Sequence, residues 1–200
     1  MSYRPRVGMA TLMSLVVIAL YFLVTWVMDQ REPEPMAWLG RYEQSIWAPL
    51  REGELTLAGV DTPLGVGRLW MISVEDEPLL VSRYVLQSDE LNWRLQAVIE
   101  LEPERMDSLI QAQDWKPGMR DQSVSPAVGT ALSSQPVERV SLIPSEPVPV
   151  KRIVATLGEP DMRMDVSEGN KAWVYGRTGV VVAVSGDQAH SLMFGLRGGR

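Results

Sequence analysis

The chain has 200 residues, a formal net charge of −6, no cysteine and a single histidine, His190. Without cysteine it has no disulfide bond, thiolate nucleophile, cysteine-ligated zinc or lipidated cysteine, and one histidine excludes a multi-histidine metal site and disfavours a Ser-His-Asp triad. Acidic side chains gather in the front half, 17 against 7 basic ones from Asp29 to Trp115, which disfavours nucleic acid and anionic lipid surfaces as partners.

Residues 7–28 form an apolar run without any Asp, Glu, Lys or Arg. A helix of this length measures about 33 Å, enough to cross a hydrocarbon core of roughly 30 Å. Arg4 and Arg6 precede the run and acidic residues follow it, so the positive-inside rule places the N-terminus in the cytoplasm. The run therefore predicts a single-pass transmembrane helix over residues 7–28, with a cytoplasmic tail over residues 1–6.

A cleaved signal peptide is the alternative for the same run. It needs a shorter apolar region of about 7–15 residues and a pair of small residues at the cleavage site. The residues after the run, Met28 to Pro33, offer no such pair. We therefore expect an uncleaved anchor in a bacterial inner membrane, with the domain that follows it in the periplasm.

A short proline-containing spacer at residues 29–35 precedes a segment with helical periodicity. Across residues 36–50 the apolar side chains recur on one helical face, and three of them are large aromatics, Trp38, Tyr42 and Trp47. Two interpretations fit this pattern. The aromatics form an interface with the membrane or with another protein, which makes them candidate interaction residues, or they pack on the sheet of their own domain.

Residues 36–116 are predicted to form an acidic α+β lobe. Beyond the aromatic segment, side chains alternate between apolar and polar with a period of two, as in half-buried strands. A proline followed by a glutamate begins a helix over residues 103–113. The strands of this lobe are predicted at residues 55–60, 68–74, 79–86 and 93–101.

The same lobe contains the candidates for carboxylate chemistry. Glu75, Asp76, Glu100 and Glu102 could supply the two carboxylates of a glycan-cleaving enzyme, which need to lie about 5–9.5 Å apart in a cleft. The acidic turn around Glu75 lacks the spacing of a calcium-binding EF-hand, so a solvated turn is favoured there. The sequence predicts no catalytic, cofactor-binding or metal-binding residue.

Residues 117–149 are rich in Ser, Pro, Gly, Ala and Val without a clear period, which predicts a linker or irregular segment with one short strand near residues 137–143. Residues 150–197 are predicted to form a second, smaller lobe. It begins with a helix at residues 150–157, followed by strands joined by short turns, as in an antiparallel meander. These strands are predicted at residues 162–166, 172–175, 180–184 and 191–196.

Two stretches of the second lobe carry a family-like pattern: V-K-R-I-V-A-T-L-G-E-P-D and, from Trp173, W-V-Y-G-R-T-G-V-V-V-A-V. They resemble the outer-membrane assembly lipoprotein family called SmpA/OmlA, or BamE-like modules. The resemblance implies a helix packed on a small antiparallel sheet, although the lipobox cysteine of typical family members is absent here. The matching positions are Leu157, Gly158, Pro160, Trp173, Tyr175 and Gly179.

These elements predict an α+β fold class: a single N-terminal transmembrane helix followed by an exported body of antiparallel β-meanders packed with short helices. We expect a non-enzymatic interaction or assembly subunit of an envelope complex, with a protein partner and without a cofactor or small-molecule substrate. Two alternatives stay open. One is a small inner-membrane subunit of a secretion or pilus machine, because the chain has the same single-pass layout and residues 55–60 resemble the opening strand of type II secretion C subunits. The other is the carboxylate hydrolase.

Overall fold

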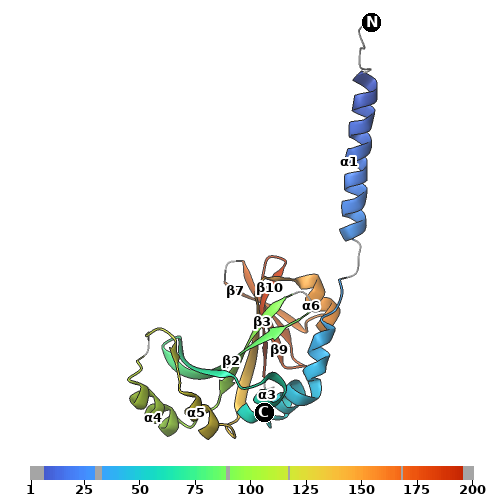
Figure 1. The fold of residues 1–200 in the computed structure, drawn as a ribbon. Helices are drawn as coiled ribbons and strands as arrows, with labels where there is room; N and C mark the ends of the chain where they lie inside the picture. The colour runs from blue at the N-terminus through green and yellow to red at the C-terminus, as the bar shows by residue number, and fades with distance from the viewer. Residues whose placement is uncertain (1–6, 30–32, 89–90, 117, 168, 196–200) are drawn as a thin grey trace. The chain divides into compact units, whose positions relative to one another are not determined.

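The computed structural model of the chain (Figure 1) describes residues 7–29, 33–88, 91–116, 118–167 and 169–195. Residues 1–6, predicted as a cytoplasmic tail, lie outside this range. The chain divides into two units, residues 1–34 and residues 35–200, which are described separately below.

Helix α1 (Val7–Asp29) is the regular element of the first unit. The side chains that the structure describes in it are those of residues 13–25. Within the described part of the chain, no helix is both long enough and apolar enough to cross a membrane. This finding contradicts the transmembrane helix predicted over residues 7–28, and with it the single-pass topology and the inner-membrane localisation.

Among the described residues of the second unit, ten strands form one sheet, and all of its strand pairs are antiparallel. The strand order is β4-β1-β2-β3-β5-β10-β9-β8-β7, with β6 paired to β10 beside this path. The strands are β1 (Arg68–Val74), β2 (Glu77–Gln87), β3 (Asn92–Ile99), β4 (Gln122–Ser123), β5 (Val137–Pro144), β6 (Val148–Pro149), β7 (Met162–Ser167), β8 (Asn170–Tyr175), β9 (Val180–Ser185) and β10 (Gln188–Phe194).

The predicted fold class requires correction in the light of this sheet. Instead of a membrane helix followed by β-meanders, the structure is a mostly antiparallel sheet with a few helices. Strand β5 joins the two halves of the sequence, because it pairs with β3 on one side and with β10 on the other. Residues on both sides of the predicted lobe boundary therefore belong to the same sheet.

Helical segments of the second unit pack on one face of this sheet. On this face, Leu80 and Tyr84 of β2 lie opposite Ile99 and Leu95 of β3, respectively. All four side chains are buried. Val85, which points to the opposite face, is 76 % exposed. The helical segments are η1 (Ala37–Tyr42), η2 (Glu43–Trp47), α2 (Ala48–Glu52), α3 (Leu57–Leu64), α4 (Pro103–Gln113), α5 (Pro126–Ala131) and α6 (Val150–Leu157).

The core on this face consists of two hydrophobic clusters. The larger one joins residues 36–60 and α6 to β3, β5, β8, β9 and β10. In the smaller one, α4 and α5 pack against β1, β2 and the end of β3 around the fully buried Trp115. Figure 1 shows α4 and α5 together at one end of the second unit, whereas α6 lies beside the strands of the C-terminal half. The larger cluster surrounds the site described below.

Several sequence predictions are confirmed. Helices α4 and α6 and strand β1 have the predicted bounds, and β2, β3, β5, β7, β8, β9 and β10 overlap their predicted ranges. The segment predicted as a helix over residues 36–50 is helical, but it changes from a 3₁₀ pattern in η1 to a π pattern in η2 and an α pattern in α2. Residues 117–149, predicted to be irregular around one strand, also contain β4, α5 and β6.

The prediction of a strand at residues 55–60 is wrong. Only Thr56 makes an isolated bridge there, to Pro136, and helix α3 begins at Leu57. Thr56 is the N-cap of α3, since its side-chain oxygen accepts a hydrogen bond from the Gly59 N–H at 3.2 Å. Leu57 and Val60 then occupy the buried face of the helix, a spacing of three that also fits its period.

Candidate functional site

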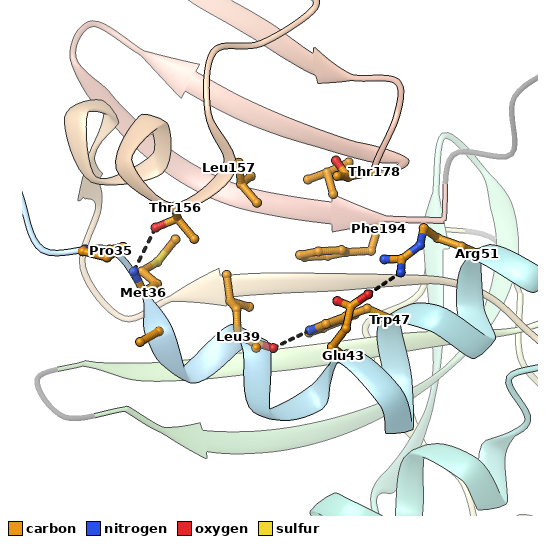
Figure 2. A pocket seen from close by; sticks show the side chains of 13 residues that line it. Pro35, Met36, Leu39, Glu43, Trp47, Arg51, Thr156, Leu157, Thr178 and Phe194 are labelled. Carbon is orange, nitrogen blue, oxygen red and sulfur yellow. Dashed lines mark hydrogen bonds and ion pairs between the residues drawn. The ribbon is translucent and has the colours of Figure 1, made fainter.

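The candidate site is an apolar groove of about 310 Å³ in the second unit, shown in Figure 2. We call it the Trp47 groove. Three parts of the chain that are far apart in sequence line it: residues from 35 to 51, residues 156–157 of α6, and residues from 178 to 194 around β9 and β10. It lies over the larger core cluster, which contributes Trp47, Val180 and Phe194 to its lining.

A stacked pair of aromatic rings forms the interior of the groove. The rings of Trp47 and Phe194 lie 4.1 Å apart between centroids at an angle of 16° (Figure 2). The Trp47 indole Nε1–H donates to the Leu39 carbonyl oxygen at 2.9 Å, so the buried polar atom of this tryptophan is satisfied. Because both rings are buried and one is held by a hydrogen bond, the groove has a rigid apolar surface.

The start of the aromatic segment, residues 36–50, is hydrogen-bonded to α6. The Met36 N–H donates to the Thr156 hydroxyl at 2.8 Å, and that hydroxyl donates to the Arg152 carbonyl at 2.7 Å. Thr156 thus satisfies a backbone group at the start of the aromatic segment while it stays bonded to its own helix. This pair of bonds sets the separation between the two walls of the groove at that end.

An ion pair between Glu43 and Arg51 lies along the groove (Figure 2). The two side chains are 49 % and 37 % exposed, respectively, so solvent screens their attraction and its contribution to stability is small. A carboxylate accepts several hydrogen bonds and a guanidinium donates five, so both groups keep capacity for further partners. The groove therefore combines an apolar interior with one charged pair.

The three predicted interaction residues lie at different depths. Trp38 and Trp47 are buried, and Tyr42 is half-buried. The Trp38 ring packs against the Trp93 ring with the two centroids 5.2 Å apart. The Tyr42 ring contacts the Trp38 ring edge-on, with the centroids 6.4 Å apart. The structure therefore places these aromatics on the sheet of their own domain, which was one of the two interpretations. Of the three, Trp47 lines the groove.

The six family-like positions lie around α6 and the β8–β9 turn. Leu157 lines the groove, Gly158 ends α6 with φ of 82°, and Gly179 has φ of 66° just before β9. The remaining three are half-buried Pro160 and, on one face of β8, half-buried Trp173 and buried Tyr175. The structure brings Leu157 next to the aromatic segment but does not gather all six positions into one site.

Sequence reasoning singled out only Trp47 and Leu157 among the groove residues, and three of the residues that it missed show why. Thr156 lies inside a predicted helix without any local signal of a long-range hydrogen bond, and Arg51 lies just beyond the predicted aromatic helix. Phe194 follows the alternation of β10, so its burial could be predicted, but nothing in the sequence indicated Trp47 as its partner. The Met36–Thr156 and Trp47–Phe194 contacts join residues more than 100 positions apart, which local patterns do not encode.

A second cavity, of about 730 Å³, lies between β1, α3 and α5. The half-buried Asp61 carboxylate accepts hydrogen bonds from the Gly67 N–H at 3.0 Å and from the Tyr84 hydroxyl at 2.8 Å. The Ser82 hydroxyl is buried on its wall without a hydrogen-bond partner among the described residues. Burial is the main cause of a raised pKa at Tyr84. Because Asp61 is already engaged by two donors, it holds the ends of α3 and β1 together.

The candidate carboxylates lie on exposed connections. Glu75 and Asp76 form the turn between β1 and β2, both with positive φ, and Glu100 and Glu102 lie between β3 and α4. None of these four side chains lines either cavity. Among the described residues, no three His, Asp or Glu side chains are grouped so as to hold a metal ion. His190 is exposed at a bulge of β10.

The raised pKa of Tyr175 predicts that the stability of the fold depends on pH in the alkaline range. Burial raises its pKa to about 12, and the negative charge of Glu159 adds to this effect. A tyrosine in the unfolded chain ionises near pH 10, so between about pH 10 and 12 the unfolded state releases a proton that the folded state keeps. Stability is therefore fully present below pH 10 and falls as the pH rises toward 12.

Replacing Tyr175 with Phe should make this fall less steep. The measurement is urea unfolding at a series of pH values from 8 to 12. Because the Tyr175 hydroxyl has no hydrogen-bond partner among the described residues, the same variant should lose less than about 1 kcal/mol at pH 7. Equal slopes for the variant and the unmodified chain would contradict the assignment.

Comparison with protein-family models, with curated proteins and with solved structures finds no match to this chain.

Proposed function

We propose that this chain is a non-enzymatic interaction module and that the Trp47 groove binds an extended segment of a protein partner. The partner segment inserts a large apolar side chain over the Trp47–Phe194 ring pair. The observation that carries this proposal is the open, mostly apolar groove with a rigid aromatic interior. Covering such surface contributes about 25 cal/mol for each Å² removed from water.

The dimensions of the groove support a peptide side chain as the occupant. A volume of about 310 Å³ lies at the low end of the roughly 300–1,000 Å³ of small-molecule sites. An aromatic or long aliphatic side chain fits this space, and large apolar anchors in such pockets dominate interface energies. Glu43 and Arg51 supply an acceptor and donors for the peptide groups on either side of the anchor.

The resemblance of residues 150–185 to BamE-like modules makes an assembly complex the partner class that we favour. Leu157, one of the matching positions, is also a groove residue. The alternative of a secretion or pilus subunit had its sequence support in residues 55–60, and these contribute to α3 rather than to a regular strand. No observation favours the carboxylate hydrolase as a second function.

Gly40 offers a direct test, because it lines the groove and a Cβ added there would meet nothing within 4 Å. A Gly40→Trp substitution should fill the groove without disturbing the core. Peptides selected on the full chain from a random library should share one large apolar residue. Their affinity should fall at least tenfold for the Gly40→Trp variant, measured by isothermal titration calorimetry.

Ala112 provides the matched control, since it is exposed on α4 and does not line the groove. An Ala112→Trp variant should bind the selected peptides as the unmodified chain does. The Nε1–H resonance of Trp47 should shift when a peptide binds. Selected peptides that bind the Gly40→Trp variant with undiminished affinity, or a selection that enriches no apolar anchor, would refute the proposal.

A further inference from the structure

Within the part of the chain that the structure describes, strand β7 leaves one edge of the sheet open. It pairs with β8 on one side, and it is the last strand of the sheet order. All six of its residues are exposed. At the opposite end of the sheet, the terminal strand β4 has two residues and α5 packs next to it on β1, which is how proteins commonly protect a sheet edge. The open edge of β7 is therefore the place where the sheet can be extended.

The side chains of β7 separate by kind between the two faces of the strand. Met162 and Met164 lie on one face and are 55 % and 44 % exposed, and Val166, at the irregular end of the strand, is 69 % exposed. Arg163 and Asp165 lie on the other face. Arg163 lies over the Trp173 ring of β8 at 4.8 Å from its centroid and pairs with Glu159 at 2.6 Å, and Asp165 lies 3.9 Å from the Lys171 ammonium group. All four charged side chains are more than half exposed, so solvent screens these pairs, and Arg163 and Asp165 keep capacity for further partners. The edge thus carries an apolar row and, behind it, one positive and one negative charge.

We infer that β7 pairs in antiparallel fashion with β7 of a second copy of this chain, around a two-fold axis at Met164. In this register Arg163 of each copy lies opposite Asp165 of the other, and Met164 lies opposite Met164. Directly opposed residues in an antiparallel pair share a face, so the apolar rows of the two copies become continuous. The interface is self-complementary, as a two-fold dimer requires.

Charge complementarity selects this register from its neighbours. Along an edge strand, only every second residue points its N–H and C=O groups toward the open side. Two such strands therefore form a regular ladder only in registers that place these residues opposite one another. Moving the axis by one residue places Arg163 opposite Arg163 or Asp165 opposite Asp165, and like charges directly opposed are destabilising. The same charges discourage pairing with strands that lack the complementary pattern.

Two features limit the strength of this dimer. The pairing of β7 with β8 is irregular between Asp165 and Ser167, so the regular stretch that can pair runs from Met162 to Asp165. A strand edge of this length buries less than the roughly 1,200–2,000 Å² of a standard interface. We therefore expect a weak, concentration-dependent dimer. It is independent of the Trp47 groove, whose residues do not include β7.

The absence of cysteine in the chain makes a specific cross-linking test possible. In the inferred register the two Met164 Cα atoms lie about 4.5–5.5 Å apart, within the range of a disulfide bond. A Met164→Cys variant of the full chain should form a disulfide-linked dimer under mild oxidation. A Val85→Cys variant, exposed on β2, is the matched control and should cross-link at least tenfold more slowly.

Charge exchange tests the register itself. By sedimentation equilibrium, the Arg163→Asp and Asp165→Arg variants should each dimerise about tenfold more weakly, because two opposite-charge pairs become like-charge pairs. The double variant Arg163→Asp/Asp165→Arg should regain affinity to within about threefold. The inference is overturned if residue 164 cross-links no faster than residue 85, if the chain stays monomeric at millimolar concentration, or if association is insensitive to the charge exchange, as it would be for another surface.

Discussion

Replacing Trp47 with alanine is expected to lower the free energy of unfolding by about 3–5 kcal/mol, the usual cost of truncating a fully buried tryptophan. The side chain is 3 % exposed and stacks on Phe194. Its removal leaves a cavity below the Trp47 groove and frees the Leu39 carbonyl from its hydrogen bond. Urea unfolding followed by far-ultraviolet circular dichroism measures the change, because six tryptophans remain and complicate a fluorescence signal.

A Trp47→Phe variant separates packing from hydrogen bonding. It keeps a ring against Phe194 but loses the Nε1–H donor, so we expect a loss of about 1–3 kcal/mol. A loss of less than 1 kcal/mol for Trp47→Ala would show that this aromatic does not belong to the core. That result would favour the other interpretation of the aromatic segment, in which its side chains serve only as contacts for a partner.

Gly67→Ala is expected to destabilise the fold by about 1–3 kcal/mol, through overpacking rather than through a cavity. A Cβ at this position would lie 2.2 Å from the Ser82 hydroxyl oxygen and 2.5 Å from the Tyr84 ring. The Gly67 N–H also donates to Asp61, so a displaced backbone would lose that bond. Thermal and urea unfolding at pH 7 give the change in stability.

Gly129 provides a matched control, because it lines the same cavity and an added Cβ would meet Leu69 at an ordinary distance of 3.4 Å. Gly129→Ala, within α5, should leave stability unchanged or raise it by up to about 1 kcal/mol. A Ser82→Ala substitution should recover part of the loss caused by Gly67→Ala, since it removes the closest obstructing atom. Equal effects of Gly67→Ala and Gly129→Ala would contradict the close packing.

Regular alternation and helix-end residues allowed much of the sheet and two helices to be predicted. Strand β1 and helix α4 have the predicted bounds, because a period of two and a proline at the first helical turn are local signals. The segment at residues 55–60 shows where local signals conflict. Leu55, Leu57 and Val60 fit a strand only loosely, and Thr56 capping the helix decided in favour of α3.

The candidate site depends on contacts that no local pattern encodes. The aromatic period of residues 36–50 predicted a buried or binding face but not which one. The Trp47–Phe194 stack and the Met36–Thr156 hydrogen bond each join positions more than 100 residues apart, and they exist because β5 draws the two halves of the chain into one sheet. The cavity around Asp61 likewise needs β1, α3 and α5 to converge.

The sequence by itself determined the period of the strands, the ends of several helices, the absence of cysteine chemistry and the apolar character of residues 7–28. It did not determine a membrane anchor, since no helix in the described part of the structure meets that requirement. The tertiary structure alone decided which aromatics are buried, where the groove lies and that β7 is an open edge. The physical reason is that periodicity reports the environment along one element, whereas cavities and edges depend on which elements become neighbours.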